Sequence, residues 1–343
     1  MIIPKFLSGN DEIGVFAPSA GIIEETDHRR FENACRRLES EGYSIRASAS
    51  TFMCDDDGRS CPADQRVAEF EELLRDPRCH AVFAISGGDY ECEMLPLIDW
   101  DVVEANPKWM QGYSDNTVLL FKITAEHDIA TVYSGNFNDF GMEPLHRSVR
   151  EGLEFLEGKR ASQESFEMHS EGFSDRVTGL EPFTEDAATI WGSDSGDARF
   201  TGRLIGGCMD VIEWFLRKGT ADAKGFVDRY RNDGIVWYLE IYDMDEDRVR
   251  RTLGEMEERG WLDGCTGMVF GRPLFYSGSK GYRDAVAEAL SGRDYPILFD
   301  ADVGHKAPRM AFINGALATF DFKEGRCTIS YDFSVDTKAS EAR

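Results

Sequence analysis

Long apolar runs are missing from this 343-residue sequence. Its longest apolar stretches, such as Ile13–Pro18 and Ala81–Ile85, are far shorter than the roughly 20 residues that a membrane-spanning helix needs. The first residues, Met1–Ser8, lack the basic region, the long apolar region and the small-residue cleavage site of a secretory signal. We therefore expect a cytoplasmic protein that does not associate with a membrane.

Basic residues are also scarce. The chain contains 38 lysines and arginines against 63 aspartates and glutamates, which gives a formal net charge of −25. A negative surface repels phosphate backbones and anionic lipids, so we expect no nucleic-acid partner. The acidic surplus is compatible with adaptation to a salty cytoplasm and equally with a surface that keeps the protein in solution.

Metal-binding and nucleotide-binding patterns are absent. The eight cysteines include no Cys-x-x-Cys pair, and no histidines stand at metal-ligand spacing. We expect the thiols to be reduced, without disulfides or zinc. Neither a Gly-x-Gly-x-x-Gly fingerprint nor a Walker loop occurs. The sequence therefore predicts neither a zinc site nor a dinucleotide site.

Alternating strands and helices organise the first third of the chain. The expected strands are Glu12–Pro18, Tyr43–Ala49, Ala81–Ile85 and Lys108–Tyr113, and the expected helices are Asp27–Gly42, Pro62–Arg75, Tyr90–Ile98 and Asn116–His127. Short apolar strands that alternate with helices predict a doubly wound, mostly parallel α/β sheet of the Rossmann or flavodoxin type. Ligands bind outside the carboxyl ends of the strands in such sheets.

The regular pattern dissolves into polar sequence between about residues 151 and 197 and then resumes. The expected later helices are Met209–Lys218 and Asp245–Arg259, and the expected strands are Ile235–Glu240, Gly267–Phe270, Ile297–Asp300, Ala316–Phe322 and Arg326–Tyr331. We predict an N-terminal domain at residues 1–160, a connection at 161–197 and a C-terminal domain at 198–343.

Ser114 stands between an expected strand and an expected helix, where a sharp turn would expose its hydroxyl above the sheet. The backbone amide of Asp115 could then donate to an oxyanion, supported by the helix dipole. Alternatively, Ser114 or Asp115 only caps the helix. A Gly-x-Ser-x-Gly elbow is incomplete here, because Asn116 stands where its second glycine would be.

Gly87 and Gly88 follow the strand one unit earlier, at the same predicted edge of the sheet. Glycines let the backbone approach a ligand closely and offer an N–H to a developing negative charge. The alternative is that the pair only forms a tight turn.

A general base must come from one of six histidines, of which His305 follows Gly304 in a loop after an apolar strand. Glu240 ends another apolar strand, where its carboxylate could orient an imidazole. A surface histidine and a strand-terminating charge are the alternatives.

Six segments together resemble the LD-carboxypeptidase family of serine peptidases, which includes the microcin C immunity peptidases. The segments are Gly14–Ser19, Ser86–Gly88, Gly112–Asp115, Gly202–Gly207, Leu239–Glu240 and Gly304–His305, with Pro308 and Gly315 behind them. The resemblance covers nearly the whole chain. It implies a β-rich α+β C-terminal domain, an active site at the domain interface and a homodimer.

Carried over from the family, Ser114 is the nucleophile, His305 is the base, and Glu240 completes the triad. The resemblance also implies an oxyanion hole made of backbone amides, namely that of Gly87 or Gly88 and that of Asp115. The reaction implied is acyl transfer through an acyl-enzyme, which requires no metal and no organic cofactor.

The Ser86–Asp89 loop and Trp191 resemble the microcin-immunity branch, which implies that Asp89 and Trp191 bind substrate. In that branch the tryptophan stacks on a nucleotide, and packing at the domain junction is the alternative. Tyr133–Asn136 and Phe312–Gly315 depart from the common family pattern.

The implied substrate is a peptide-like or aminoacyl-nucleotide conjugate of the microcin C type. One alternative is an LD-carboxypeptidase that releases the terminal D-alanine of a muropeptide. Another is a protein on the same scaffold that binds a ligand without catalysis.

Overall fold

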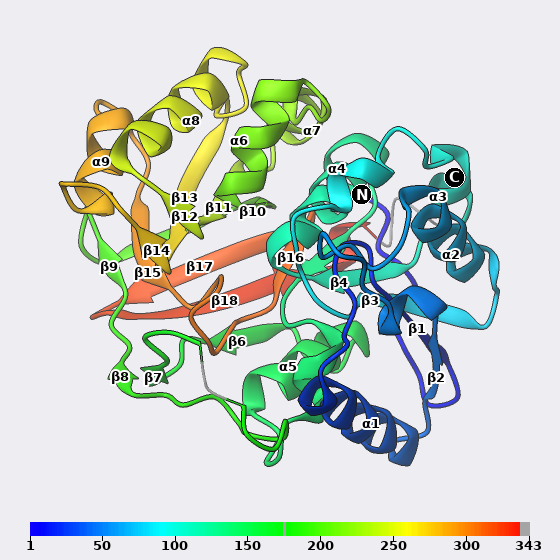
Figure 1. Ribbon diagram of the computed structural model, residues 1–343. Coiled ribbons are helices and arrows are strands. Elements are labelled where there is room, and N and C mark those ends of the chain that lie inside the picture. Colours follow the sequence, from blue (N-terminus) through cyan, green and yellow to red (C-terminus); the bar gives the residue numbers. More distant parts are fainter. Residues whose placement is uncertain (174–175, 337–343) are drawn as a thin grey trace.

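Two β-sheets with helices packed on them make up the computed structural model, which describes residues 1–173 and 176–336 (Figure 1). The first sheet has six strands in the order β16-β5-β4-β3-β1-β2. Five of these strands are parallel and come from the N-terminal region: β1 (Glu12–Phe16), β2 (Ser44–Ala47), β3 (Cys79–Ala84), β4 (Trp109–Gly112) and β5 (Thr131–Tyr133). The strands at the centre of this sheet, β3 and β4, are almost completely buried, as their short apolar sequences indicate.

Helices cover the first sheet: α1 (Glu25–Ser40), α2 (Ala63–Arg75), α3 (Trp100–Ala105), α4 (Thr117–His127) and α5 (Arg147–Leu156). Each longer helix buries an apolar stripe, which in α1 includes Phe31, Ala34 and Leu38 at helical spacing. α4 is different, because it is buried along most of its length between the two sheets.

The helix expected over Tyr90–Ile98 is wrong. The chain forms only a short 3₁₀ turn, η2 (Glu91–Met94), and α3 begins later, where the side chain of Asp99 accepts a hydrogen bond from the amide of Asp101. Pro96 explains the break, because proline has no N–H to donate and disfavours helical geometry in the residue before it.

The second sheet has eight strands in the order β6-β18-β17-β10-β11-β13-β15-β9. Its parallel core consists of β10 (Ala198–Cys208), β11 (Ile235–Glu240), β13 (Cys265–Gly271) and β15 (Ile297–Ala301), flanked by antiparallel β6 (Ser162–Glu164), β9 (Gly192–Ser193), β17 (Leu317–Lys323) and β18 (Arg326–Asp332). Its helices are α6 (Met209–Lys218), α7 (Lys224–Tyr230), α8 (Glu246–Glu258) and α9 (Tyr282–Ala289). The predicted fold class, a parallel α/β sheet followed by a β-rich region, is confirmed.

Short segments join the two sheets. β16 (Phe312–Asn314), far along the chain, adds antiparallel to β5 in the first sheet, while α4 packs against β10 of the second. The polar stretch 161–197 contains β6, β9 and the small pair β7 (Met168–His169) and β8 (Ala187–Ala188). A second small pair joins β12 (Asp243–Met244) to β14 (Phe275–Tyr276). The boundaries at residues 160 and 197 stay predictions.

No helix in the described ranges 1–173 and 176–336 is long and apolar enough to cross a membrane.

Candidate active site

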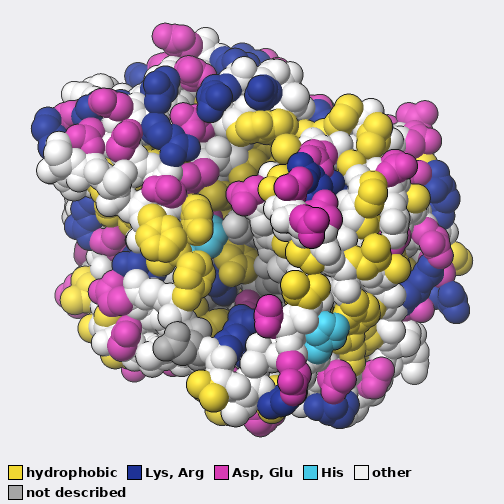
Figure 2. All heavy atoms as spheres, in the orientation of Figure 1, with side chains coloured by type: hydrophobic (Ala, Val, Ile, Leu, Met, Phe, Trp, Pro, Cys, Tyr) yellow, Lys and Arg dark blue, Asp and Glu magenta, His cyan; other side chains and the backbone are white. Residues whose placement is uncertain are grey.

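A cavity of about 620 Å³ lies at the carboxyl ends of strands from both sheets. Its walls come from the loops after β1, β3, β4 and β5, from the end of β10, and from the segments after β11 and β15. Figure 2 shows the molecule hollowed near its centre, with hydrophobic and acidic side chains around the opening. The cavity is therefore placed where ligands collect in parallel sheets.

Ser114 lies on this wall, in the turn between β4 and α4. Its φ of +68° is uncommon for a residue with a side chain and marks a sharp, locally strained turn. The amide of Ser114 donates to the hydroxyl of Tyr133 (3.0 Å), and Thr117 Oγ1 donates to the carbonyl of Ser114 (2.7 Å). Neither Ser114 nor Asp115 makes a capping hydrogen bond to α4, whose N-cap is Asn116.

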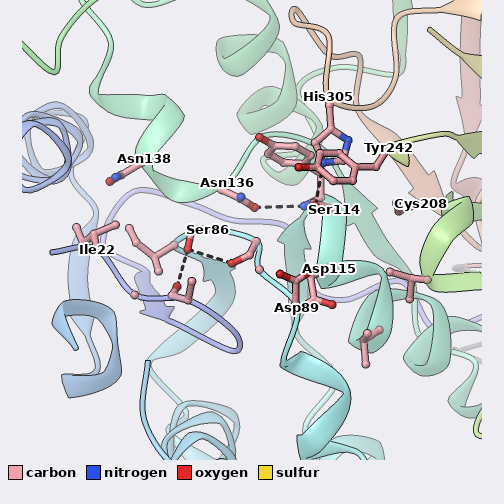
Figure 3. A pocket seen from close by; sticks show the side chains of 18 of the residues that line it. Ile22, Ser86, Asp89, Ser114, Asp115, Asn136, Asn138, Cys208, Tyr242 and His305 are labelled. Atoms are coloured by element: carbon pink, nitrogen blue, oxygen red, sulfur yellow. Dashed lines mark hydrogen bonds between the residues drawn. The ribbon is translucent and has the colours of Figure 1, made fainter. Parts of the chain in front are cut away.

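His305 and Glu240 come together with Ser114 across the boundary between the sheets. His305 Nε2 lies 2.9 Å from Ser114 Oγ, and His305 Nδ1 lies 3.0 Å from Glu240 Oε2. Glu240 is fully buried at the end of β11, and His305 is 5% exposed in the loop after β15 (Figure 3 shows His305 over Ser114). Gly304 permits this approach, because a Cβ there would lie 2.6 Å from Glu240 Oε2.

The contacts of the imidazole define its tautomer. The Glu240 carboxylate can only accept a hydrogen bond, so the imidazole proton is on Nδ1, which donates to it. Nε2 then carries no proton and accepts from the Ser114 hydroxyl. The rings of Tyr113 and Tyr242 flank the imidazole, with centroids 5.3 Å and 4.6 Å away. A hydroxyl, an imidazole and a carboxylate connected in this order can transfer the hydroxyl proton to Nε2.

Glu240 keeps its charge despite its burial. Burial pushes the pKa of Glu240 upward, but the charge and hydrogen bond of His305, with hydrogen bonds from Tyr133 and Cys208, outweigh it and leave the pKa below its ordinary value. Tyr133 Oη donates to Glu240 Oε1 at 2.7 Å. Burial and the negative charge of Glu240 raise the pKa of Tyr133 far above its ordinary value, so its phenol stays protonated and remains a donor.

The glycine pair packs directly on the serine turn. A Cβ on Gly87 would lie 3.1 Å from Ser114 Cβ and 3.2 Å from Ser114 Oγ. Gly88 has a φ of +150°, and a Cβ there would collide with the hydroxyl of Ser19. A side chain on Gly88 would therefore clash with Ser19, and one on Gly87 would be tightly packed against Ser114.

Trp191 does not face the cavity, which corrects the expectation that it stacks on a substrate. It is 1% exposed, and its indole Nε1 donates to Asp302 Oδ2 at 3.0 Å. Asp302 also accepts from Arg272 (2.6 Å) and from the amide of Phe166 (2.9 Å). Trp191 is therefore a packing residue beside a buried ion pair, which is the alternative considered from the sequence.

Phe173 is an aromatic residue that sequence reasoning missed. It lines the cavity and is 62% exposed, and the centroid of its ring lies 6.5 Å from that of Phe275. It lies in the polar stretch without periodicity, so no pattern distinguished it. Sequence reasoning also missed the roles of Tyr133, the last residue of β5, which donates to Glu240, and of Asp210, which lines the cavity two residues after β10.

Replacing Trp191 with phenylalanine is expected to lower the free energy of unfolding by ~1–3 kcal/mol, because a hydrogen bond to a buried carboxylate is lost. Denaturant unfolding measures the difference. The Phe173→Ala variant is the control and should unfold like the wild type, since this ring is largely exposed. Equal losses of stability in the two variants would contradict the buried position of Trp191.

Among the described residues, no group of three or more His, Cys, Asp or Glu side chains is arranged to hold a metal ion.

Comparison with protein families identifies the chain. The LD-carboxypeptidase N-terminal domain matches residues 13–134, and the LD-carboxypeptidase C-terminal domain matches residues 201–320. The chain belongs to the LD-carboxypeptidase family. Both matched regions contribute to the cavity, and the prediction of a peptidase of this family is confirmed at the level of the family.

Individual relatives in the LD-carboxypeptidase family have different names. A Vibrio cholerae protein named as a candidate carboxypeptidase is 26% identical over 94% of this chain and 96% of its own length. The microcin C7 self-immunity protein MccF of Escherichia coli is 23% identical over 95% of each chain. A Bacillus subtilis protein named as a candidate murein peptide carboxypeptidase is 22% identical over 95% of this chain and 93% of its own.

Solved structures of MccF share the fold. A MccF variant in complex with adenosine monophosphate has a TM-score of 0.80 at 22% identity, covering 97% of this chain and 99% of its own. MccF in complex with glutamyl sulfamoyl guanosine has a TM-score of 0.79 at 21% identity, covering 96% and 98%. These similarities establish the fold over 96–97% of the chain and do not assign a substrate to it.

Proposed function

We propose that the protein is a serine peptidase in which Ser114, His305 and Glu240 form the catalytic triad. The observation that carries this proposal is the hydrogen-bonded chain from Ser114 Oγ through His305 to Glu240, with distances of 2.9 Å and 3.0 Å. His305 Nε2 takes the proton of Ser114, and the serine oxygen attacks an amide carbonyl. Glu240 holds the imidazole and stabilises its charged form.

Backbone amides are proposed to stabilise the tetrahedral oxyanion. The glycine pair is close to the serine turn, since a Cβ on Gly87 would lie 3.2 Å from Ser114 Oγ and 3.7 Å from the amide nitrogen of Asp115. We assign the oxyanion to the amide of Gly87 or Gly88 and the amide of Asp115. His305 then protonates the leaving nitrogen, and water, activated by the same imidazole, hydrolyses the acyl-enzyme. Each proton transfer in this sequence uses side chains of this chain and water.

The proposed substrate is an aminoacyl-nucleotide conjugate of the microcin C type. MccF has been solved with aspartyl sulfamoyl adenosine and with glutamyl sulfamoyl guanosine, and a cavity of about 620 Å³ is of the size that holds such small molecules. Phe173, exposed on the cavity wall, would supply the aromatic surface that the sequence assigned to Trp191.

Asp89 supports a substrate that carries a free amino group near the scissile bond. Its side chain is exposed on the cavity wall and forms no hydrogen bond or ion pair with the residues that the structure describes. Arg176, a cation at this cavity, is already paired with Asp27 at 2.7 Å. In an aminoacyl conjugate the ammonium nitrogen is two bonds from the carbonyl carbon that is attacked. The unpaired carboxylate of Asp89 would attract this positive charge.

The two substrate classes can be separated in one assay. We expect the purified protein to release the amino acid from an aminoacyl sulfamoyl adenosine, to release no D-alanine from a muropeptide tetrapeptide, and to lose the first activity in Ser114→Ala. D-alanine release alone would instead support an LD-carboxypeptidase. If neither substrate is cleaved and the nucleotide conjugate binds Ser114→Ala and the wild type equally, the protein is a binding protein.

The role of Asp89 is tested with the same conjugate. Asp89→Asn should raise KM ~10-fold for the conjugate with a free amino group, because one charged hydrogen bond is lost. An N-acetylated conjugate is the matched control and should show the same KM with both proteins. Equal effects on the two conjugates would contradict recognition of the ammonium group. The homodimer and the cytoplasmic location stay predictions.

A further inference from the structure

The side chain of Asp115 is largely buried and connects three loops. It is 7% exposed, and its Oδ2 accepts a hydrogen bond from the amide of Glu91 at 3.0 Å. The fully buried hydroxyl of Ser19 also donates to this carboxylate and accepts from the amide of Tyr90 at 2.9 Å. One carboxylate therefore connects the turn after β4 to the loops after β1 and β3.

These contacts surround the glycine loop, residues 86–91. Gly88 lies against the hydroxyl of Ser19, and Gly87 lies against Ser114. The amide of Ala20 donates to the carbonyl of Gly87 at 3.2 Å, which adds a further attachment to the loop after β1. The glycine loop is thus held on one side by Ser19 and on the other by Asp115 and the serine turn.

We propose that Asp115 is a positioning residue. Its carboxylate holds the glycine loop against the serine turn, so that the amides that bind the oxyanion keep their positions. The inference rests on the proposed function, because it assigns a task to the amides of Gly87, Gly88 and Asp115. Such donors stabilise a transition state only where they are preorganised, and a displacement of about 1 Å can cost ~10²-fold in rate.

The pKa of Asp115 indicates how its charge affects the stability of the fold. Burial raises the pKa of Asp115 to about 6, although hydrogen bonds from Ser19 and Glu91 oppose the shift. The groups that face it are the carboxyls of Asp89 and Glu91, with the thiol of Cys92 beside them. Burial and the charge of Asp115 raise the pKa of Glu91 far above its usual value, whereas Arg66 lowers it.

The direction of the pH effect follows from this raised pKa. An aspartate whose pKa is higher in the folded state than in the unfolded chain contributes stability below pH ~4, and this contribution is lost as the pH rises through about 6. The ionised carboxylate that holds the loop therefore exists above pH 6 at a cost in stability.

Asp115→Asn is expected to lower kcat ~10²-fold with KM changed less than ~3-fold. The neutral amide has one acceptor oxygen in place of two and lacks the negative charge, so it holds the Ser19 hydroxyl and the Glu91 amide more weakly. At pH 7.5 the variant should melt at the same temperature as the wild type or higher. Below pH 6 the wild-type kcat should fall more steeply than that of Asp115→Asn, because only the wild type loses the charge of Asp115 there.

Amide hydrogen exchange provides a measurement that needs no substrate. Amides of residues 86–91 should exchange at least ~10-fold faster in Asp115→Asn than in the wild type at pH 7.5. Asp99→Asn is the matched control, because exposed Asp99 also accepts from a backbone amide, that of Asp101 at 3.2 Å, and lies outside the cavity. Ser19→Ala is the second variant and should shift exchange in the same direction.

The two proposals fail in different ways. A wild type that cleaves neither substrate refutes the proposed function, and loop exchange still decides whether Asp115 holds the loop. Unchanged exchange in both Asp115→Asn and Ser19→Ala, or faster exchange with unchanged kcat, would overturn the positioning role while the triad stands. An Asp115→Asn variant that melts far below the wild type at pH 7.5 would make the carboxylate structural and would also overturn it.

Discussion

Ser114→Ala is expected to lower kcat by ~10⁴- to 10⁶-fold, the range found when a triad nucleophile is removed. The variant keeps the imidazole and its carboxylate but lacks the oxygen that attacks the carbonyl. Alanine accepts the same backbone geometry as serine, so the melting temperature should change little. Hydrolysis of the aminoacyl conjugate and thermal unfolding measure the two effects.

A serine-directed phosphonate makes this result specific to one side chain. It should add one adduct to the wild type, located by mass spectrometry on the peptide that contains Ser114, and none to Ser114→Ala. Ser195→Ala is the control and should be labelled at the wild-type rate, because Ser195 is exposed and lies outside the cavity. Labelling of the Ser114→Ala variant at full rate would show that another residue is the nucleophile.

Glu240→Gln is expected to lower kcat ~10³- to 10⁴-fold, because a neutral amide neither fixes the imidazole tautomer nor stabilises the imidazolium. The substitution preserves shape, and Tyr133 can still donate to the amide oxygen. The measurement is kcat for the conjugate across pH. Since the pKa of Glu240 is below its ordinary value, its charge is present throughout the neutral range, and the loss should be the same at pH 6 and pH 8.

The stability that Glu240 contributes depends on pH in the direction usual for a carboxylate with a lowered pKa. A depressed folded-state pKa contributes stability above the unfolded value of ~4.3, and this contribution disappears as the pH falls through the folded-state pKa. Tyr133→Phe is the companion variant, which removes one hydrogen bond to Glu240 and should cost only ~10-fold in kcat. A Glu240→Gln variant within tenfold of wild-type kcat would refute the proposed role of this carboxylate.

Short-range patterns predicted the elements that carry the candidate site. The apolar run Ala81–Ile85 predicted β3, and the alternation of strands and helices predicted the parallel sheet that the structure contains. Because the carboxyl ends of parallel strands meet at one edge, the loops holding Gly87 and Ser114 were expected side by side, and they are in contact. The same reasoning failed at Tyr90–Ile98, where periodicity suggested a helix and Pro96 interrupts it.

Side-chain direction was beyond these patterns. Trp191 and Phe173 both lie in the polar stretch between the two sheets, and nothing in the surrounding sequence distinguishes the buried ring from the exposed one. The sequence suggested two roles for Asp115, a helix cap and a backbone amide that binds an oxyanion. In the structure its carboxylate instead accepts a hydrogen bond from the amide of Glu91, 24 residues earlier in the chain. Such contacts depend on how distant loops pack, which local propensity does not encode.

The sequence by itself determined the strands, most of the helices, the family resemblance and the residue types available for chemistry, because these depend on local periodicity and motifs. Only the tertiary structure brought His305 to Ser114 across 191 positions of the chain, and Glu240 to His305 across 65. That convergence requires β11 and β15 of the second sheet to end at the same cavity as β4 of the first. It results from packing between the sheets, including α4 against β10 and β16 against β5, which no single segment specifies.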